Sequence, residues 1–335
     1  MTNPVLEKIL SRARAAGKRI VLPETDDPRV LKAARAVTDQ GYAAVTLLGQ
    51  PQKVQAAARA LGLSLEGIEI IDHLAEPQRE KYVQALFEKR KAKGMTRDQA
   101  DALLKGFPYY GAMLVGDGRV DGMVVGSICP TADTVRAGIF GVGLSPGNKT
   151  VSSCSVMLTQ IAEFGVQGAV IFADTGVLPT PTVEQLADIA VAAAQSCRVL
   201  LDTEPLVAMI SFSTKGSAKG PEPERVIAAT RLAQQRCPQL KIDGELQVDA
   251  AMMPDIAARK CQGSPVAGKA NTLVFPDLNC GNSAYKLVER FGRAAALGPL
   301  LQGLARPIND LSRGCSVDDI AQVTAITCLQ ATGGQ

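Results

Sequence analysis

The chain has 335 residues, of which 46% are hydrophobic, so it can bury packed cores and is long enough for two domains. Its 36 basic and 33 acidic residues leave a net charge of +3, and aromatic residues make up 4% with no tryptophan, so neither charge nor stacking surface indicates nucleic-acid binding. The start of the chain lacks the apolar run of a secretion signal, and no stretch of about 18 apolar residues predicts a membrane span.

Strand patterns alternate with helix patterns along most of the chain. The expected strands cover residues 19–23, 43–48, 68–71, 120–125, 150–157, 169–172, 206–212, 241–246 and 272–275. The expected helices open at Pro4 and Pro28 and cover parts of 52–61, 78–113, 132–140, 183–196, 222–235, 250–259 and 283–291. Continuous apolar strands alternating with helices predict an α/β fold with mostly parallel sheets flanked by helices.

Two turn-rich stretches divide this pattern. Pro146-Gly147-Asn148 is the best boundary, and Leu297-Gly298-Pro299 is the next. The expected domains are therefore residues 1–147 with 299–335, and residues 148–298. The C-terminal helix would then return to the first domain, and we expect the active site in the cleft between the two domains.

The segment Pro307 to Ile320 is the most informative part of the chain. Ser312, Arg313 and Gly314 stand directly before a predicted helix, whose free N–H groups and dipole favour an anion. The planar guanidinium of Arg313 matches phosphate oxygens. Asp319 falls in the first turn of that helix, which is typical of a phosphate-handling site. The spacing Ser316-x-x-Asp319 equally fits a capping box, so Asp319 is also explained as a helix cap.

Several nucleotide and nucleophile motifs are missing. No G-x-G-x-x-G occurs, and residues 143–150 have the wrong spacing for a P-loop. The eight cysteines show no C-x-x-C spacing, which argues against a zinc knuckle and favours free thiols in the cytoplasm. His73 is the one histidine, so a poly-histidine metal site is excluded and no metal is expected.

Segments in order along the chain carry a family likeness. They are residues 22–24, 91–96, 131–138, 211–217, 243–251, 275–286 and 309–316, the last reading Asn-Asp-Leu-Ser-Arg-Gly-Cys-Ser. On these segments the chain resembles the phosphate acetyl/butyryl transferase family from about residue 19 to residue 329. The resemblance implies two α/β domains with an active-site cleft, a homodimer formed through the second domain, and an acyltransferase.

The reaction implied by the resemblance is reversible transfer of acetyl between acetyl phosphate and coenzyme A. Coenzyme A is then a substrate, and no tightly bound cofactor is expected. The substrates are small molecules, with neither nucleic acid nor membrane as partner. Propionyl or butyryl transfer is an alternative, as is dehydrogenase chemistry on a related fold or silent acyl-coenzyme A binding. The sequence does not decide the acyl-chain length.

The resemblance also implies roles for individual residues. Ser312, Arg313 and Asp319 fall on catalytic positions of the family. Arg90 and Arg136 fall on two further important arginines, although a solvated helix face explains Arg90 and an ion pair with Asp133 explains Arg136. Two hydroxyls close to Arg136 in sequence are candidates for substrate binding or, alternatively, for helix capping. They are Ser127 and Thr131.

The expected mechanism is direct attack of the coenzyme A thiolate in a ternary complex. Moving a proton from a thiol of pKa about 8.5 to an ordinary aspartate of pKa about 3.9 is uphill by about 6 kcal/mol. Asp319 therefore acts as a base only if its pKa is raised, or if thiolate formation and attack are concerted. Cys315 is the tempting enzyme nucleophile, but it has no histidine nearby in sequence and is better interpreted as a packing residue.

Overall fold

The structure, a computed structural model, describes residues 3–333 and divides into two compact units. The split unit consists of Ile9–Pro146 and the stretch from Leu304 onward. The central unit consists of Gly147–Gly303 together with the start of the chain up to Lys8. Each unit has its own sheet and core, as the α/β prediction required. The expected cleft between two domains stays a prediction.

The split unit is built on a fully parallel five-stranded sheet in the order β11-β4-β1-β2-β3. Its strands are β1 (Arg19–Leu22), β2 (Ala44–Leu48), β3 (Glu69–Ile71), β4 (Gly122–Val125) and β11 (Ile308–Asp310). Its helices are α2 (Pro28–Asp39), α3 (Pro51–Ala60), α4 (Arg79–Arg90), α5 (Arg97–Leu103), α6 (Phe107–Asp117), α7 (Thr131–Gly141) and α13 (Val317–Gln330), with a short 3₁₀ turn at Lys91–Lys93 and α1 (Pro4–Ala16) entering from the central unit.

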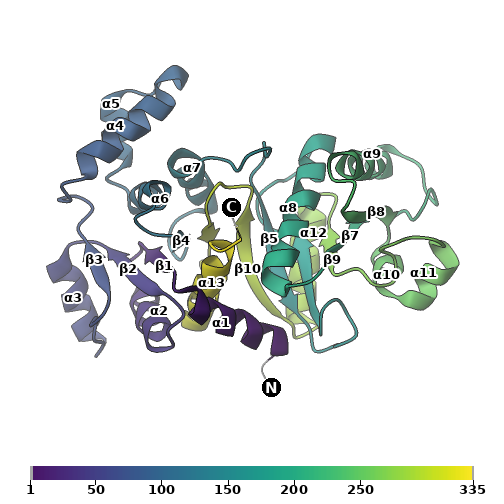
Figure 1. The fold of residues 1–335 in the computed structure, drawn as a ribbon, viewed down its shortest axis with the longest axis horizontal. Coiled ribbons are helices and arrows are strands. Elements are labelled where there is room, and N and C mark those ends of the chain that lie inside the picture. Colours follow the sequence, from purple (N-terminus) through teal and green to yellow (C-terminus); the bar gives the residue numbers. More distant parts are fainter. Residues whose placement is uncertain (1–2, 334–335) are drawn as a thin grey trace. The chain divides into compact units, whose positions relative to one another are not determined.

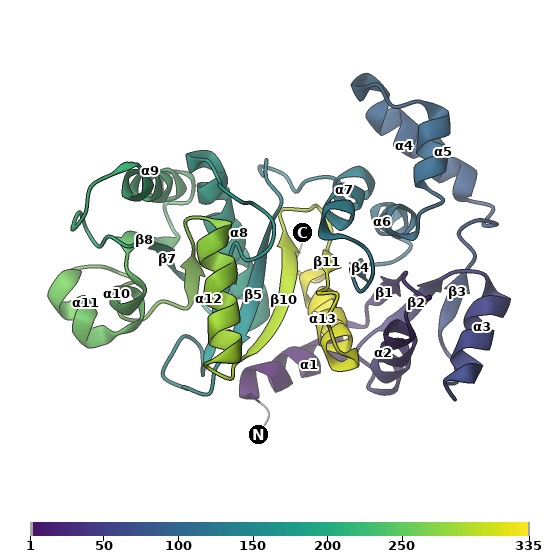
Figure 2. The same cartoon turned by 180° about the vertical axis from the view of Figure 1, so that it is seen from behind.

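Helices cover both faces of this sheet. In Figures 1 and 2, α2, α3 and α13 lie on one face, and α6 and α7 lie on the other. The core includes Val21, Met123, Ile308 and Tyr110, which are buried between the layers. Local sequence explains the helix starts: the Asp27 side chain accepts a hydrogen bond from the Arg29 N–H, and Pro28 holds the first helical position.

The central unit has a six-stranded mixed sheet in the order β10-β5-β6-β9-β7-β8. Its strands are β5 (Ser152–Leu158), β6 (Ala169–Ala173), β7 (Leu206–Ile210), β8 (Lys241–Leu246), β9 (Thr272–Val274) and β10 (Ala295–Gln302). Its helices are α8 (Val183–Leu201), α9 (Pro221–Arg236), α10 (Val248–Met252), α11 (Pro254–Lys260) and α12 (Leu278–Arg290). The pairs β10–β5 and β5–β6 are antiparallel and the other pairs are parallel.

The prediction of one continuous helix over residues 250–259 was wrong. Two short helices, α10 and α11, replace it, because Pro254 lacks the N–H that would continue the first helix. Strands β10 and β11 were not predicted. Within residues 3–333, no helix is both long and apolar enough to span a membrane.

Candidate functional site

Three loops meet at one edge of the split unit's sheet. They follow β1 (residues 23–27), β4 (residues 126–130) and β11 (residues 311–316), and we call them the carboxyl-edge loops. The chain runs β1 to β2 to β3 on one side and then places β4 on the other side of β1. Ligands of open α/β sheets bind outside the carboxyl ends of the strands at such a switch point. The topology therefore places a candidate site at these loops.

Glu24 fixes the loop after β4. Its side chain is only 1% exposed and accepts five hydrogen bonds from that loop. Its Oε2 accepts from the Gly126 N–H (2.8 Å), the Ser127 N–H (2.8 Å) and the Ser127 hydroxyl (2.9 Å). Its Oε1 accepts from the N–H groups of Ile128 (3.0 Å) and Cys129 (2.7 Å). A buried carboxylate saturated in this way holds the loop in one conformation.

Arg29, in the first turn of α2, ties all three loops together. Its Nη1 donates to the carbonyl oxygens of Arg313 (2.9 Å) and Cys315 (2.8 Å). Its Nη2 donates to the Ser127 carbonyl (3.2 Å) and to Asp27 Oδ2 (2.6 Å). Burial alone would raise the pKa of Asp27, but the hydrogen bonds from Arg29 hold it below its ordinary value. The Asp27–Arg29 ion pair therefore stays charged at neutral pH and positions the loop that carries Arg313.

The predicted anion-binding residues are exposed at this edge. Ser312, Arg313 and Gly314 are all exposed, and the Ser312 hydroxyl oxygen accepts the Gly314 N–H at 3.3 Å. Within residues 3–333 the Arg313 guanidinium forms no ion pair. Its backbone is fixed by Arg29 while its side chain is available to a ligand, which is the arrangement that anion recognition requires.

Asp319 forms the capping box predicted from its spacing. The Ser316 N–H donates to Asp319 Oδ2 at 2.8 Å, and the Asp319 N–H donates to the Ser316 hydroxyl at 3.1 Å. Both bonds belong to the start of α13. Capping occupies one carboxylate oxygen of this half-buried side chain, so the structure supports the capping interpretation and is compatible with a second role.

Asp310, which the sequence analysis did not single out, lies at the end of β11. It is 1% exposed, and its carboxylate accepts hydrogen bonds from the hydroxyls of Thr131 (2.5 Å) and Thr134 (3.0 Å) on α7. Burial raises the pKa of Asp310 to about 6, and the two threonine hydrogen bonds limit that rise. This carboxylate joins the start of α7 to the segment that leads into Ser312.

The two hydroxyls predicted for substrate binding both donate hydrogen bonds to buried carboxylates. The Ser127 hydroxyl donates to Glu24, and the Thr131 hydroxyl donates to Asp310. Neither caps a helix through its side chain, since Pro130 holds the cap position of α7. Ser127 is buried and Thr131 is half-buried, so the Thr131 oxygen is the more accessible of the two to a substrate. A substrate contact through Thr131 stays a prediction.

Arg90 and Arg136 lie on different helices, and Arg90 contacts an aromatic ring on the helix that carries Arg136. The Arg90 guanidinium lies 4.2 Å from the centre of the Phe140 ring, which is one turn beyond Arg136 on α7. Arg90 is half-buried and its Nε has no hydrogen-bond partner among the described residues, so it is more than a solvated helix face. Arg136 forms the predicted ion pair with Asp133 at 3.4 Å, but both side chains are largely exposed and the pair is weak.

The cysteines show no sign of an activated thiolate. Burial raises the pKa of the Cys315 thiol to about 11, although nearby Arg29 lowers it. Burial raises that of Cys154 to about 12. All eight cysteines carry free thiols. Among the described residues, no cluster of three or more His, Cys, Asp or Glu side chains is arranged to hold a metal ion.

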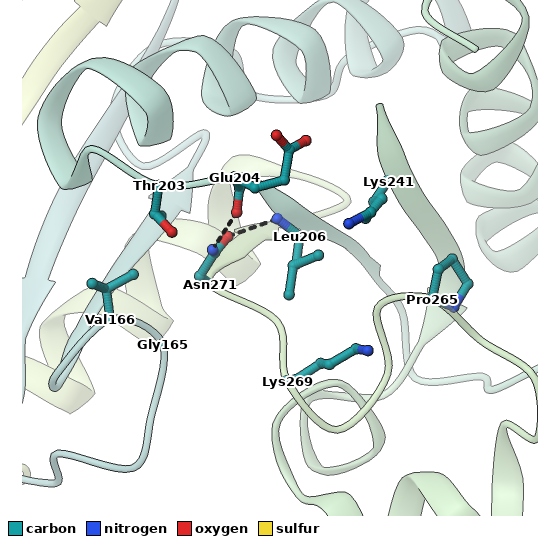
Figure 3. Close-up of a pocket in the computed structure, with 9 residues that line it drawn as sticks. All are labelled: Gly165, Val166, Thr203, Glu204, Leu206, Lys241, Pro265, Lys269 and Asn271. Carbon is teal, nitrogen blue, oxygen red and sulfur yellow. Dashed lines mark hydrogen bonds between the residues drawn. The ribbon is translucent and has the colours of Figure 1, made fainter. Parts of the chain in front are cut away.

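Two pockets bear on the choice of site. One of about 370 Å³ lies beside the loop after β1, and its lining includes Glu24, Lys53 and His73. Another, of about 500 Å³, lies in the central unit at the amino ends of β7, β8 and β9 (Figure 3). There the Asn271 side chain bridges the Glu204 carbonyl and the Leu206 N–H, which is a structural role. Because amino ends of parallel strands rarely bind ligands, we favour the carboxyl edge of the split unit.

Signals for the missed residues were present but weak. Glu24 directly follows a buried strand, which is where functional residues of α/β folds gather, and Asp310 precedes Ser312 by two residues. Arg29 has no local signal, because its partners Arg313 and Cys315 are more than 280 positions away in sequence.

Comparison with known proteins places the whole chain in one family. The family profile "Phosphate acetyl/butaryl transferase" matches residues 4–328. The chain is 48% identical to a phosphate acetyltransferase of Acetivibrio thermocellus, over 97% of this chain and 98% of that protein. It is 46% identical to a phosphate acetyltransferase of Thermoanaerobacterium thermosaccharolyticum, over 98% of this chain and 99% of the relative. A phosphotransacetylase crystal structure from Streptococcus pyogenes superposes with a TM-score of 0.91 at 40% identity, covering 97% of this chain and 98% of that one.

Proposed function

Because the chain belongs to the phosphate acetyl/butyryl transferase family and is an acyltransferase, we propose that it transfers acetyl reversibly between acetyl phosphate and coenzyme A. The observation that carries this proposal is the exposed Ser312-Arg313-Gly314 loop before α13. Arg29 fixes the backbone of this loop through hydrogen bonds to the carbonyl oxygens of Arg313 and Cys315. A phosphoryl group placed there meets a free guanidinium and the positive end of a helix dipole.

The proposed chemistry is a direct acyl transfer. The coenzyme A sulfur attacks the carbonyl carbon of acetyl phosphate, the C–S bond forms, and the C–O bond to phosphate breaks. Arg313 stabilises the negative charge that develops on the departing phosphate, and Ser312 donates to the oxyanion or to a phosphate oxygen. Asp319 is the catalytic carboxylate that the family resemblance indicates. Its half-buried position beside the same helix start supports this role, although one oxygen is used in capping.

Arg90 and Arg136 are proposed to bind the anionic groups of the substrates. Acetyl phosphate and coenzyme A both carry several negative charges, and each charge-assisted hydrogen bond contributes about 1.5–3 kcal/mol. The exposed Arg136 and the incompletely bonded Arg90 support this assignment. Thr131 is proposed to contact substrate through its oxygen, while Ser127 shapes the loop.

A covalent acetyl-enzyme is not part of the proposal. Two candidate thiols, Cys315 and Cys154, are buried and have raised pKa values of about 11 and about 12, so they are protonated at neutral pH. The substrate already supplies a thiol. Transfer within a ternary complex is therefore the simpler path.

Measurement of thioester formation tests the function. Acetyl phosphate and coenzyme A should give acetyl-coenzyme A and phosphate in equal amounts, and the reverse reaction should consume the thioester. A comparison of acetyl, propionyl and butyryl phosphates at equal concentrations decides acyl-chain length. A higher kcat/KM for butyryl phosphate than for acetyl phosphate would replace the proposed substrate with the alternative one.

The homodimer predicted from the family resemblance is proposed to form through the central unit. Leu287 on α12 and Phe291 just after it lie four positions apart and are 55% and 86% exposed. Large apolar side chains exposed one helical turn apart are candidates for burial at a protein interface. Light scattering should show a dimer for the wild type and for Ile161→Glu, an exposed control in the same unit, and a monomer for Phe291→Glu. A monomeric wild type at micromolar concentration would contradict the proposal.

The cytoplasmic location stays a prediction that the free thiols support.

A further inference from the structure

A pocket opens at the carboxyl edge of the split unit's sheet, on the side of β1 away from β11. It has a volume of about 370 Å³ and is lined by the segments that follow β1, β2 and β3, together with the starts of α3 and α6. Parallel strands bind ligands at their carboxyl ends, and pockets of about 300–1,000 Å³ are the usual size for small molecules. Ser312, Arg313, Arg90 and Arg136 do not line this pocket, so it is available to another part of a substrate.

Hydrogen bonds join the loops that form the pocket. The Thr25 hydroxyl donates to the Leu48 carbonyl oxygen at 2.7 Å. The Gly49 N–H donates to the Ile71 carbonyl oxygen at 2.9 Å. Gly49 has φ +147°, and a Cβ there would approach Thr25 Oγ1 to 3.0 Å and a methyl group of Val54 to 2.9 Å. Glycine is therefore required where the loops after β1 and β2 pack together, and the walls of the pocket are fixed relative to one another.

One end of the pocket is positively charged. The helix α3 begins there at Pro51, its cap residue Gln50 makes no side-chain hydrogen bond to the helix, and its first turn has no acidic residue. The N–H groups of that turn and the helix dipole favour an anion. Lys53 lies in the same turn, lines the pocket and is exposed, so its ammonium can reach the same ligand.

The rest of the pocket suits a nucleoside. Leu74, which is 53% exposed, and the half-buried Phe107 line it, and a flat base packs well on such side chains. His73 also lines it and is held by the Lys105 carbonyl oxygen, 3.2 Å from Nε2. Burial lowers the pKa of His73, so this ring is a neutral wall at pH 7. The exposed carboxylate of Asp26 can accept a hydrogen bond from a ribose hydroxyl.

The distance from the loop that carries Ser312 matches the length of one arm of coenzyme A. Three strand spacings of about 4.8 Å separate β11 from β2, so the loop after β11 and the start of α3 lie about 14 Å apart along the sheet edge. The pantetheine arm has about 13 bonds between sulfur and the first phosphorus, and an extended chain advances about 3.4 Å for every three bonds, or about 15 Å in all. A thiol beside Ser312 and a nucleotide beside α3 can therefore belong to one molecule.

We propose that this pocket binds the adenosine end of coenzyme A, with its 3′-phosphate at the start of α3. The inference rests on the proposed acetyl transfer and names the place where its second substrate is held. Lys53 and the N–H groups of the first turn bind the phosphate. The base lies against Leu74 and Phe107, and Asp26 accepts the ribose 2′-hydroxyl. Contacts at this end hold coenzyme A while its thiol reaches the loop with Ser312.

Two variants of α3 test the pocket against matched controls on the same helix. Lys53→Ala removes the charge, and Arg59→Ala is its control. Ala57→Phe fills the pocket, and Ala56→Phe is its control, since Arg59 and Ala56 are exposed and do not line it. Lys53→Ala should raise the KM for coenzyme A about tenfold or more, as the loss of one charge-assisted hydrogen bond does. Ala57→Phe should raise it too, while both controls and every KM for acetyl phosphate should stay close to wild type.

Dephospho-coenzyme A, which lacks the 3′-phosphate, identifies the group that Lys53 binds. Lys53→Ala and the wild type should have nearly the same KM for it, because the partner of the ammonium is missing in both cases. Titration calorimetry with adenosine 3′,5′-bisphosphate measures the pocket without turnover. This probe should bind the wild type and Arg59→Ala, and should bind Lys53→Ala about tenfold more weakly. Thermal melting identifies any variant that fails to fold, and Lys53→Ala carries the test if Ala57→Phe does.

Two results would overturn the site while leaving the proposed function intact. One is a wild-type KM for coenzyme A in both Lys53→Ala and Ala57→Phe. The other is an equal loss with coenzyme A and dephospho-coenzyme A in Lys53→Ala, which would show that the ammonium does not bind the 3′-phosphate. A wild-type protein that forms no thioester would overturn the proposed function, and the calorimetric titration would still decide whether the pocket binds the nucleotide.

Discussion

Replacement of Glu24 by glutamine should destabilise the split unit strongly, although the change alters only one atom. The carboxylate accepts two N–H groups at Oε1 and three donors at Oε2, and it is almost fully buried. Whichever way the amide of Glu24→Gln is turned, its NH₂ group faces at least two backbone N–H groups. Two charge-assisted hydrogen bonds are therefore lost, at about 1.5–3 kcal/mol each, so the free energy of unfolding should fall by about 3–6 kcal/mol.

Urea unfolding followed by tyrosine fluorescence measures this effect in the right unit. The chain has no tryptophan, and of its five tyrosines only Tyr285 belongs to the central unit. In a Tyr285→Phe background the signal therefore reports on the split unit alone. With a slope of about 1–3 kcal/mol per molar urea, the midpoint should fall by about 1 M or more.

An exposed glutamate of the same unit provides the control. Glu66→Gln removes the same charge from the surface and should leave the midpoint close to that of the parent protein. Equal midpoints for Glu24→Gln and Glu66→Gln would refute the argument that the loop after β4 depends on the Glu24 carboxylate. Because this loop leads into α7, we also expect Glu24→Gln to have a lower kcat.

Four further predictions concern the carboxyl-edge loops. Arg313→Ala should lower turnover by orders of magnitude and Arg313→Lys should not restore it, since an ammonium lacks the planar fork; near-normal thioester formation in both at saturating substrates would contradict this. Asp319→Asn should lower the rate by more than its change in thermal stability explains, because the amide still caps α13 but takes up no proton; a loss matched by stability alone would leave capping as its role. Cys315→Ala should stay active with intersecting initial-rate lines, and parallel lines or acetyl trapped on denatured protein would disprove direct transfer. The pKa of Asp310 is about 6 in the folded protein against an ordinary 3.8, so the folded protein binds this proton more tightly and its free energy of unfolding falls as pH rises from about 4 to 6. Measured relative to Asp310→Asn, the fall should be about 3 kcal/mol. A difference in unfolding free energy between the two proteins that stays constant with pH would contradict the assignment.

Local sequence signals accounted for most of the fold. The predicted strand over residues 241–246 matches β8, and the Asp27-Pro28 start matches α2, because apolar runs, caps and prolines act within a few residues of where they stand. The capping box at Ser316 and Asp319 was readable for the same reason. The strands that were missed lack such signals. β10 contains Gly298-Pro299 and changes register there, and β11 has only three residues, two of them polar.

The site itself was only partly readable. Ser312 and Arg313 were found because a hydroxyl, a guanidinium and a glycine precede a helix, which is a local pattern. Glu24 and Asp310 were missed because their burial depends on donors more than 100 positions away, at Ser127 and Thr131. A buried carboxylate is stable only with such partners, and the sequence does not show which distant segments will supply them.

The divided arrangement of the split unit has a consequence for synthesis on the ribosome. Strands β1 to β4 are translated early, but β11, the neighbour of β4, and the loop with Arg313 are made only after residues 147–303. At about 5–20 residues per second that interval lasts roughly 8–30 s. During this interval β4, whose four residues are all apolar, has no neighbouring strand on one side. An unpaired apolar strand edge is a recognised hazard for aggregation. The folding of this protein in a cell should accordingly depend on how the half-made sheet is shielded until its closing strand emerges.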